Sequence, residues 1–184
     1  MSRPASVNAR LRAGLPFIAG AVTALALGVH ASAHDPSHRD FVITGFDSVR
    51  SWKAAFSTAA VLLFASQLGS GLRVHGRIGP TRPAPPWLHE VHRLLGTLAF
   101  ALTIPVVFHC IWSIGYETFH LRQAIHSAAG CIAYGLYVAK VLAARKADQQ
   151  PTWVLPVTGS LVGVAFIVAW WGQALWFYQG GGSP

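Results

Sequence analysis

Five apolar stretches of this chain are each about long enough to cross a lipid bilayer, and this constrains the fold more than any other feature. A spanning helix needs about 20 mostly apolar residues. Only 11% of the residues are charged, whereas soluble domains carry roughly a quarter. The sequence therefore predicts an all-α integral membrane bundle of five transmembrane helices, a four-helix core plus an N-terminal span. The expected spans cover approximately residues 15–33, 54–72, 90–116, 120–142 and 152–178.

The distribution of charge predicts how the bundle is oriented. With a cytoplasmic N-terminus, the inner segments hold ten basic and two acidic residues, and the outer segments hold four of each. This asymmetry is the positive-inside bias of membrane proteins. It accounts for the whole net charge of +8, so no nucleic-acid partner is needed to explain it. We expect a multi-pass protein of the bacterial inner (plasma) membrane with its C-terminus outside.

The first apolar stretch has two interpretations. Basic residues precede an apolar centre at 15–29, and Ala31-Ser32-Ala33 matches a signal-peptidase site. That order is typical of a signal peptide, but also of a first span with small residues at the outer surface. Cleavage would leave a chain that begins at His34 and contains four spans. We expect the span to be retained, because the resemblance described below includes it.

Both cysteines, Cys110 and Cys131, lie inside expected spans. Disulfide frameworks belong to loops in an oxidising compartment, so we interpret the two residues as small packing side chains. The sequence contains no C-x-x-C or C-x-x-C-H pattern. This excludes an obvious zinc site and a c-type haem attachment.

Two histidines, His109 and His126, lie inside apolar sequence. Ionisable side chains within a span are costly and usually face the bundle interior. The third and fourth spans are antiparallel, and the midpoint between the two histidines falls in the turn that joins them. At about 1.5 Å per residue, both lie roughly 10 Å below the outer surface. Haem iron accepts neutral imidazole as an axial ligand, so the pair is our first candidate for a haem b site. The alternative is that each histidine hydrogen-bonds a neighbouring helix.

A second pair shares a depth near the inner face. His92 and Lys140 are also equidistant from the turn, with His92 as a lower-ranked iron ligand and Lys140 as a snorkelling lysine or a propionate partner. Gly96 follows His92, and Gly130 follows His126, by four residues, which places each glycine on the same helix face as its histidine. That space suits a flat macrocycle, and equally suits close helix packing.

Helix spacing raises an objection to the outer pair. Directly packed helices lie about 8–10 Å apart, too close for a haem between two histidines. The third and fourth spans must therefore lie diagonally or splay at a kink at Pro105; otherwise His30 or His34 supplies an outer ligand. Arg93 and Arg122 are candidate partners of the haem propionates.

The assembled motifs resemble those of small membrane b-type cytochromes, the cytochrome b561-like and ferric-reductase-type bundles. They are more similar still to an uncharacterised family of five-span actinobacterial membrane proteins. The matching text is HDPS at 34–37, HRLLGTLAF at 92–100, IPVVFHCIWSIG at 104–115, HSAAGCIAYG at 126–135, VAK at 138–140 and ALWFY at 174–178. The resemblance covers nearly the whole chain and implies membrane location and haem. The cytochromes supply paired histidines from four core helices, whereas here the second span has only His75 at its edge and the fifth has none. We therefore expect one haem rather than two.

Three functions follow from these patterns. The first is a membrane electron-transfer protein that binds haem b and passes electrons between a membrane donor such as quinol and a redox protein partner, rather than a stand-alone enzyme. The second is a non-redox scaffold subunit with hydrogen-bonded structural histidines. The third is a proton or metal-ion pathway through the histidines, which ranks last because no intramembrane carboxylate accompanies them.

Overall fold

The computed structural model describes residues 7–180, and side chains from residue 13 onward; residues 1–6 and 181–184 lie outside that description, Arg3 among them. Within the described residues the fold is all-helical and contains no strand. Five helices are long and apolar enough to cross a membrane, which confirms the expected fold class. The elements are α1 (Val7–Ala33), α2 (Val49–Val74), α3 (Pro86–His109), α4 (Leu121–Ala144), a 3₁₀ turn η2 (Ala147–Gln149), α5 (Val154–Trp170) and α6 (Trp176–Tyr178), with π-helical segments η1 (Cys110–Ile114) after α3 and η3 (Trp171–Leu175) after α5.

The second helix begins five residues earlier than the hydropathy of the sequence suggests. Ser48 closes a capping box with Ser51: its side chain accepts from the Ser51 backbone N–H at 3.2 Å, and the Ser51 hydroxyl accepts from the Ser48 N–H at 3.1 Å. Such a reciprocal cap satisfies backbone donors that the first turn leaves free. As a result Trp52 and Lys53, expected in a loop, belong to the first turns of α2 and are both buried.

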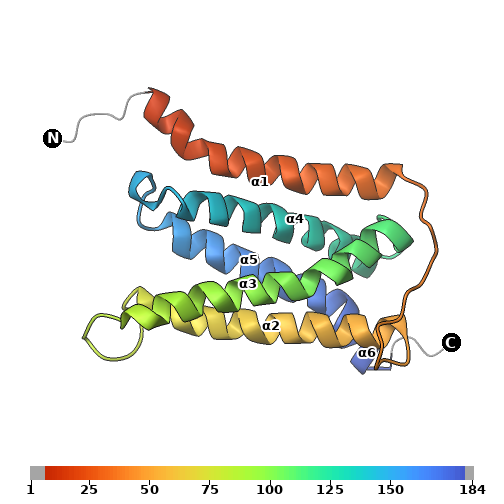
Figure 1. Ribbon diagram of the computed structural model, residues 1–184. Helices are drawn as coiled ribbons and strands as arrows, with labels where there is room; N and C mark the ends of the chain where they lie inside the picture. The colour runs from red at the N-terminus through yellow and green to blue at the C-terminus, as the bar shows by residue number, and fades with distance from the viewer. Residues whose placement is uncertain (1–6, 181–184) are drawn as a thin grey trace.

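The helices are arranged so that chain neighbours are not always packing neighbours (Figure 1). Helix α1 packs on α4, α4 on α5, α5 on α2, and α2 on α3. Helices α3 and α4 meet through side chains: the Phe100 ring stacks on Tyr137 with centroids 3.8 Å apart, and the hydroxyls of Thr103 and Tyr134 lie 2.7 Å apart. The two helices that carry the candidate outer histidines therefore face each other across the bundle.

The outward-facing surfaces of the long helices carry many exposed apolar side chains. Leu25, Leu62 and Leu68 are more than half exposed, while the interior is built around the stacked rings of Phe64 and Phe166, whose centroids are 4.6 Å apart. A water-soluble bundle would bury such leucines to remove them from solvent. This distribution supports a multi-pass membrane protein. We call the end of the bundle that holds the α1–α2 and α3–α4 connections the outer end, following the charge bias of the sequence.

Helix α1 joins the bundle through a crossing of small residues. A Cβ added to Gly20 would lie 2.5 Å from the Gly135 carbonyl oxygen and 2.8 Å from the Ala139 Cβ, and a Cβ on Gly135 would meet the Gly20 carbonyl oxygen and Ala24 in the same way. Each helix thus presents a small-xxx-small pair, Gly20 with Ala24 and Gly135 with Ala139. Such pairs let helix backbones approach closely in lipid.

We expect Gly135→Leu to detach α1 from α4, because its side chain cannot be placed without separating the two backbones. Overpacking of this kind typically costs about 1–3 kcal/mol. The loss is measured as a lower midpoint of denaturant unfolding in detergent. Gly163→Leu is the matched control, since a Cβ at Gly163 meets no atom within 4 Å. Equal stability of the two variants would contradict the tight crossing.

Candidate functional site

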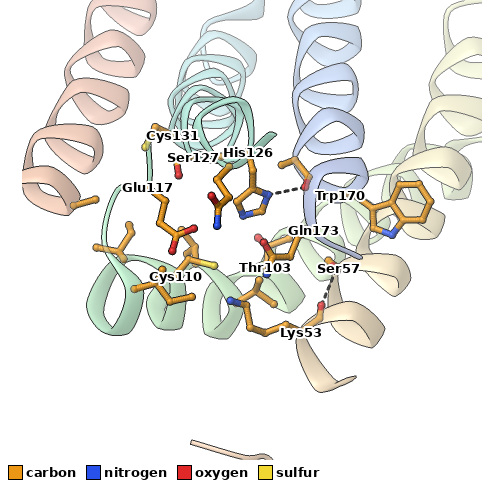
Figure 2. A pocket seen from close by; sticks show the side chains of 18 of the residues that line it. Lys53, Ser57, Thr103, Cys110, Glu117, His126, Ser127, Cys131, Trp170 and Gln173 are labelled. Carbon is orange, nitrogen blue, oxygen red and sulfur yellow. Dashed lines mark hydrogen bonds between the residues drawn. The ribbon is translucent and has the colours of Figure 1, made fainter. Parts of the chain in front are cut away.

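A cavity of about 300 Å³ lies at the outer end of the bundle and receives side chains from all five long helices (Figure 2). Ligand pockets in proteins have volumes of roughly 300–1,000 Å³. The lining is mixed: apolar and aromatic walls surround a set of polar and ionisable side chains, which are Arg50, Lys53, Ser57, Thr103, Cys110, Glu117, Arg122, Gln123, His126, Ser127, Tyr134 and Gln173.

Both π-helical segments of the described chain contribute side chains to the wall of this cavity. Segment η1 contributes Cys110, and η3 contributes Gln173. A π-helical turn inserts one extra residue into an α-helix, changes which side chains face inward, and is frequent at functional sites. The local backbone of α3 and α5 is thus altered where each helix reaches the cavity.

His126 lies on α4 with its ring held in one orientation. Its Nδ1 lies 2.7 Å from the Ala169 carbonyl oxygen. A carbonyl only accepts, so Nδ1 carries the proton and Nε2 of the neutral ring is an acceptor. Figure 2 shows the second ring nitrogen turned into the cavity. Gly172 makes this placement possible, because a Cβ there would lie 3.1 Å from the His126 Cβ.

Lys53 reaches the cavity from α2 although its side chain is almost fully buried, with 3% exposed. Its Nζ donates to Nδ1 of His109 at 3.5 Å, and it interacts with the Cys110 thiol, which also interacts with His126. The neutral His109 ring stands between Lys53 and the carboxylate of Asp40, to which its Nε2 donates at 3.2 Å, so this carboxylate reaches Lys53 only through the imidazole. A buried charge without a counter-charge in direct contact is costly, so an oxygen-bearing ligand beside Lys53 would be favoured.

Gln123 contributes an unsatisfied acceptor to the same cavity. Its Oε1 is buried and has no donor within the described part of the chain. Leaving a buried acceptor unpaired costs about 1–3 kcal/mol. The cavity therefore combines the unpaired acceptor of Gln123 with a donor at Lys53, which also bonds to His109, and an acceptor on His126, which also faces the Cys110 thiol. A ligand with both donors and acceptors can bond to all three.

The cavity carries a positive charge. Three cationic side chains and the carboxylate of Glu117 line it, a net charge of +2 with histidine neutral. The guanidinium of Arg122 donates to the Gly172 carbonyl oxygen and lies 4.1 Å from the centre of the Trp176 ring. Arg122, a sequence candidate for a propionate partner, is thus held at the wall of the cavity.

His109 does not line this cavity. Its side chain is 1% exposed, its Nε2 donates to the Asp40 carboxylate at 3.2 Å, and its Nδ1 accepts from Lys53. Phe41 and Trp52 surround the ring, with centroids 5.3 and 5.9 Å away. The structure therefore does not bring His109 and His126 together as two ligands of one iron. The reason is rotational: successive residues of a helix point about 100° apart, and it is Cys110 that faces His126.

The inner candidates also have structural partners. Nδ1 of His92 donates to the Gln67 carbonyl oxygen at 3.1 Å and lies 3.0 Å from the Ser70 hydroxyl. The space beside Gly96 is filled by Gln67, whose side-chain nitrogen would lie 2.0 Å from a Cβ there. Lys140 packs against Gly159, where an added Cβ would meet it at 3.4 Å. Gly96 thus permits close helix packing.

The remaining candidates divide between the cavity and the surface. Gly130 lines the cavity, and a Cβ there would meet no atom within 4 Å. Arg93 is exposed and pairs with Glu90. His34 stacks on His30 with centroids 4.9 Å apart and donates to the His30 carbonyl oxygen at 2.9 Å. Neither Arg93 nor His34 belongs to the cavity lining.

Most of the polar side chains of the cavity are not among the sequence candidates, and three of them carry the argument: Lys53 lies one residue before the expected second span, Cys110 is interpreted from the sequence as a packing side chain, and Gln123 belongs to no motif. A lysine near the start of an apolar stretch was the one available signal. Among the described residues no three His, Cys, Asp or Glu side chains gather closely enough to hold a metal ion.

The fold and the cavity together define a multi-pass helical membrane protein with a polar, ligand-sized site at its outer end. The chain belongs to a family of unknown function, DUF6529, whose model matches residues 13–184. No curated protein and no solved structure matches the chain.

Proposed function

We propose that this protein is a membrane electron-transfer protein of the bacterial plasma membrane, whose outer cavity binds the head group of a quinol while a redox protein partner accepts the two electrons that the quinol gives up. The observation that carries the proposal is the combination of an unpaired acceptor on Gln123, an imidazole acceptor on His126 and a buried donor on Lys53 in one cavity. A quinol hydroxyl can donate to either acceptor, and a quinol or quinone oxygen can accept from Lys53.

The walls of the cavity suit a flat ring. Tyr134, Phe166 and Trp170 contribute aromatic surface, and aromatic rings prefer offset-stacked or edge-to-face contacts with one another. Ligand sites are commonly apolar with a few convergent polar groups. In this proposal the aromatic side chains hold the ring, while Lys53, Gln123 and His126 fix its orientation.

Haem b is the second candidate, favoured by the fixed ring of His126. Metal-ligating histidines almost always donate their other ring N–H to a carbonyl, a carboxylate or water, as His126 does to Ala169. Gly130 leaves open space one turn away, and the net charge of +2 complements two propionates. Haem would supply one-electron transfer there. His126 would be its only histidine ligand from the cavity lining, so this site fits a haem less completely than it fits a quinol.

Two measurements on the purified protein in lipid nanodiscs test the proposal. We expect a quinone without a side chain to quench tryptophan fluorescence in a saturable way, because Trp170 and Trp176 line the cavity. A reduced-minus-oxidised spectrum with the sharp α-band of a low-spin haem b would instead identify the second candidate. Neither quenching nor an α-band, in protein from haem-replete cells, would overturn both.

A further inference from the structure

A groove with a volume of about 510 Å³ lies between the outer halves of α1 and α4. Its inner end is the tight crossing of Gly20 and Gly135. Its outer end is closed where the Tyr116 N–H donates to the Ala31 carbonyl oxygen at 2.8 Å. The two helices are therefore fixed to each other at both ends of the groove.

The groove is lined mostly by small and aliphatic side chains, with Tyr116 among its other lining residues. Gly28 lies in its wall, and a Cβ there would meet only the Cys131 sulfur, at 3.9 Å. Leu25 and Val29 stand at its rim and are 68% and 63% exposed. In a bilayer these leucine and valine side chains would contact lipid chains, so the groove opens toward the membrane interior.

The groove and the polar cavity share part of their walls. Cys131 and Tyr116 line both. A polar site with donors and acceptors thus lies on one side of these two residues, and an apolar groove that opens to lipid lies on the other. A ligand that fits both parts has a polar head and an apolar chain.

We propose that this groove holds the apolar chain of the quinol whose head group occupies the cavity. The assignment rests on the proposed function, since the same groove without a polar head beside it would be filled by a lipid acyl chain. Membrane quinols carry a polyisoprenoid chain that keeps them in the bilayer. The gap between α1 and α4 is then the lateral entrance of the site, and α1 is a functional wall of it.

Photo-crosslinking in nanodiscs tests the assignment. The probe is a decyl benzoquinone with a diazirine on its chain, and the reference is a phospholipid with the same diazirine on an acyl chain. We expect the quinone probe to label residues 24–33 and 128–132, and excess unlabelled decyl quinone to remove that labelling. Gly28→Leu fills the groove and should reduce labelling by more than half. Gly163→Leu adds the same side chain elsewhere and should leave labelling unchanged.

The other outcomes separate two failures. If the quinone without a chain quenches fluorescence but the probe labels α2 or α5, the chain leaves elsewhere and this inference is overturned while the proposed function stands. If both probes label all lipid-facing helices alike, with no competition, an acyl chain fills the groove. If the quinone without a chain does not bind, the proposed function itself fails. An intact mass that lacks α1 would also overturn the inference, because the groove would not exist.

Discussion

The affinity for quinone falls by about tenfold or more when His126 is replaced by alanine, while the bundle remains folded. A tenfold loss corresponds to about 1.4 kcal/mol, within the range of about 0.5–1.5 kcal/mol for one hydrogen bond. His126 is half-buried, and its ring spans the distance from the Ala169 carbonyl oxygen to the cavity. The alanine variant removes the acceptor at Nε2 and leaves both neighbouring helices with their own packing. Tryptophan quenching by the quinone without a chain measures the loss.

His92→Ala is the matched control for this experiment. His92 lies near the inner end of α3 and bonds to Gln67 on α2, so its loss should leave quinone quenching unchanged. If His126→Ala binds quinone as tightly as the unaltered protein, the cavity acceptor plays no part and the head group lies elsewhere. If a haem α-band is present and is lost in His126→Ala alone, the second candidate is supported instead.

The sequence predicted the helices well because hydropathy is a property of a whole segment. Each of the five expected spans lies within or close to a helix of the structure. The errors occur where a local interaction decides the boundary. The cap at Ser48 extends α2 outward and brings Lys53 into the bundle. Serine is so common in polar loops that Ser48 cannot be recognised as a helix cap from the sequence.

The sequence assigns the candidate histidines to helices but does not determine the direction of their side chains. Counting residues from the turn assigns His109 and His126 to the outer halves of two neighbouring spans, and in the structure one of the two, His126, lines the cavity. It does not determine which way each side chain points, because a shift of one residue rotates a side chain by about 100°. Cys110 rather than His109 therefore faces His126. The unpaired oxygen of Gln123 has no sequence signal at all, since it depends on what its neighbours leave unsatisfied.

The histidines of this chain consequently divide by role. His34 and His92 bond to backbone carbonyl oxygens of their own or a neighbouring helix, as the structural alternative expected. His126 also bonds a carbonyl but keeps its second nitrogen toward a cavity. His109 is different again, because it joins the outer loop at Asp40 to the buried Lys53 of α2. Removing it should therefore affect folding rather than ligand binding.

His109→Ala is expected to lower the free energy of unfolding by about 2–5 kcal/mol, the range for truncating large buried side chains to alanine. The change opens a cavity beside Trp52 and Phe41 and leaves Lys53 buried without its imidazole acceptor. Denaturant unfolding in detergent measures the loss, with His120→Ala, at an exposed position of the outer turn, as the control. The folded fraction should still bind quinone, because His109 lies outside the cavity lining. If His109→Ala keeps its stability but loses quinone quenching or a haem α-band, His109 is a ligand after all, and the pair with His126 forms on binding.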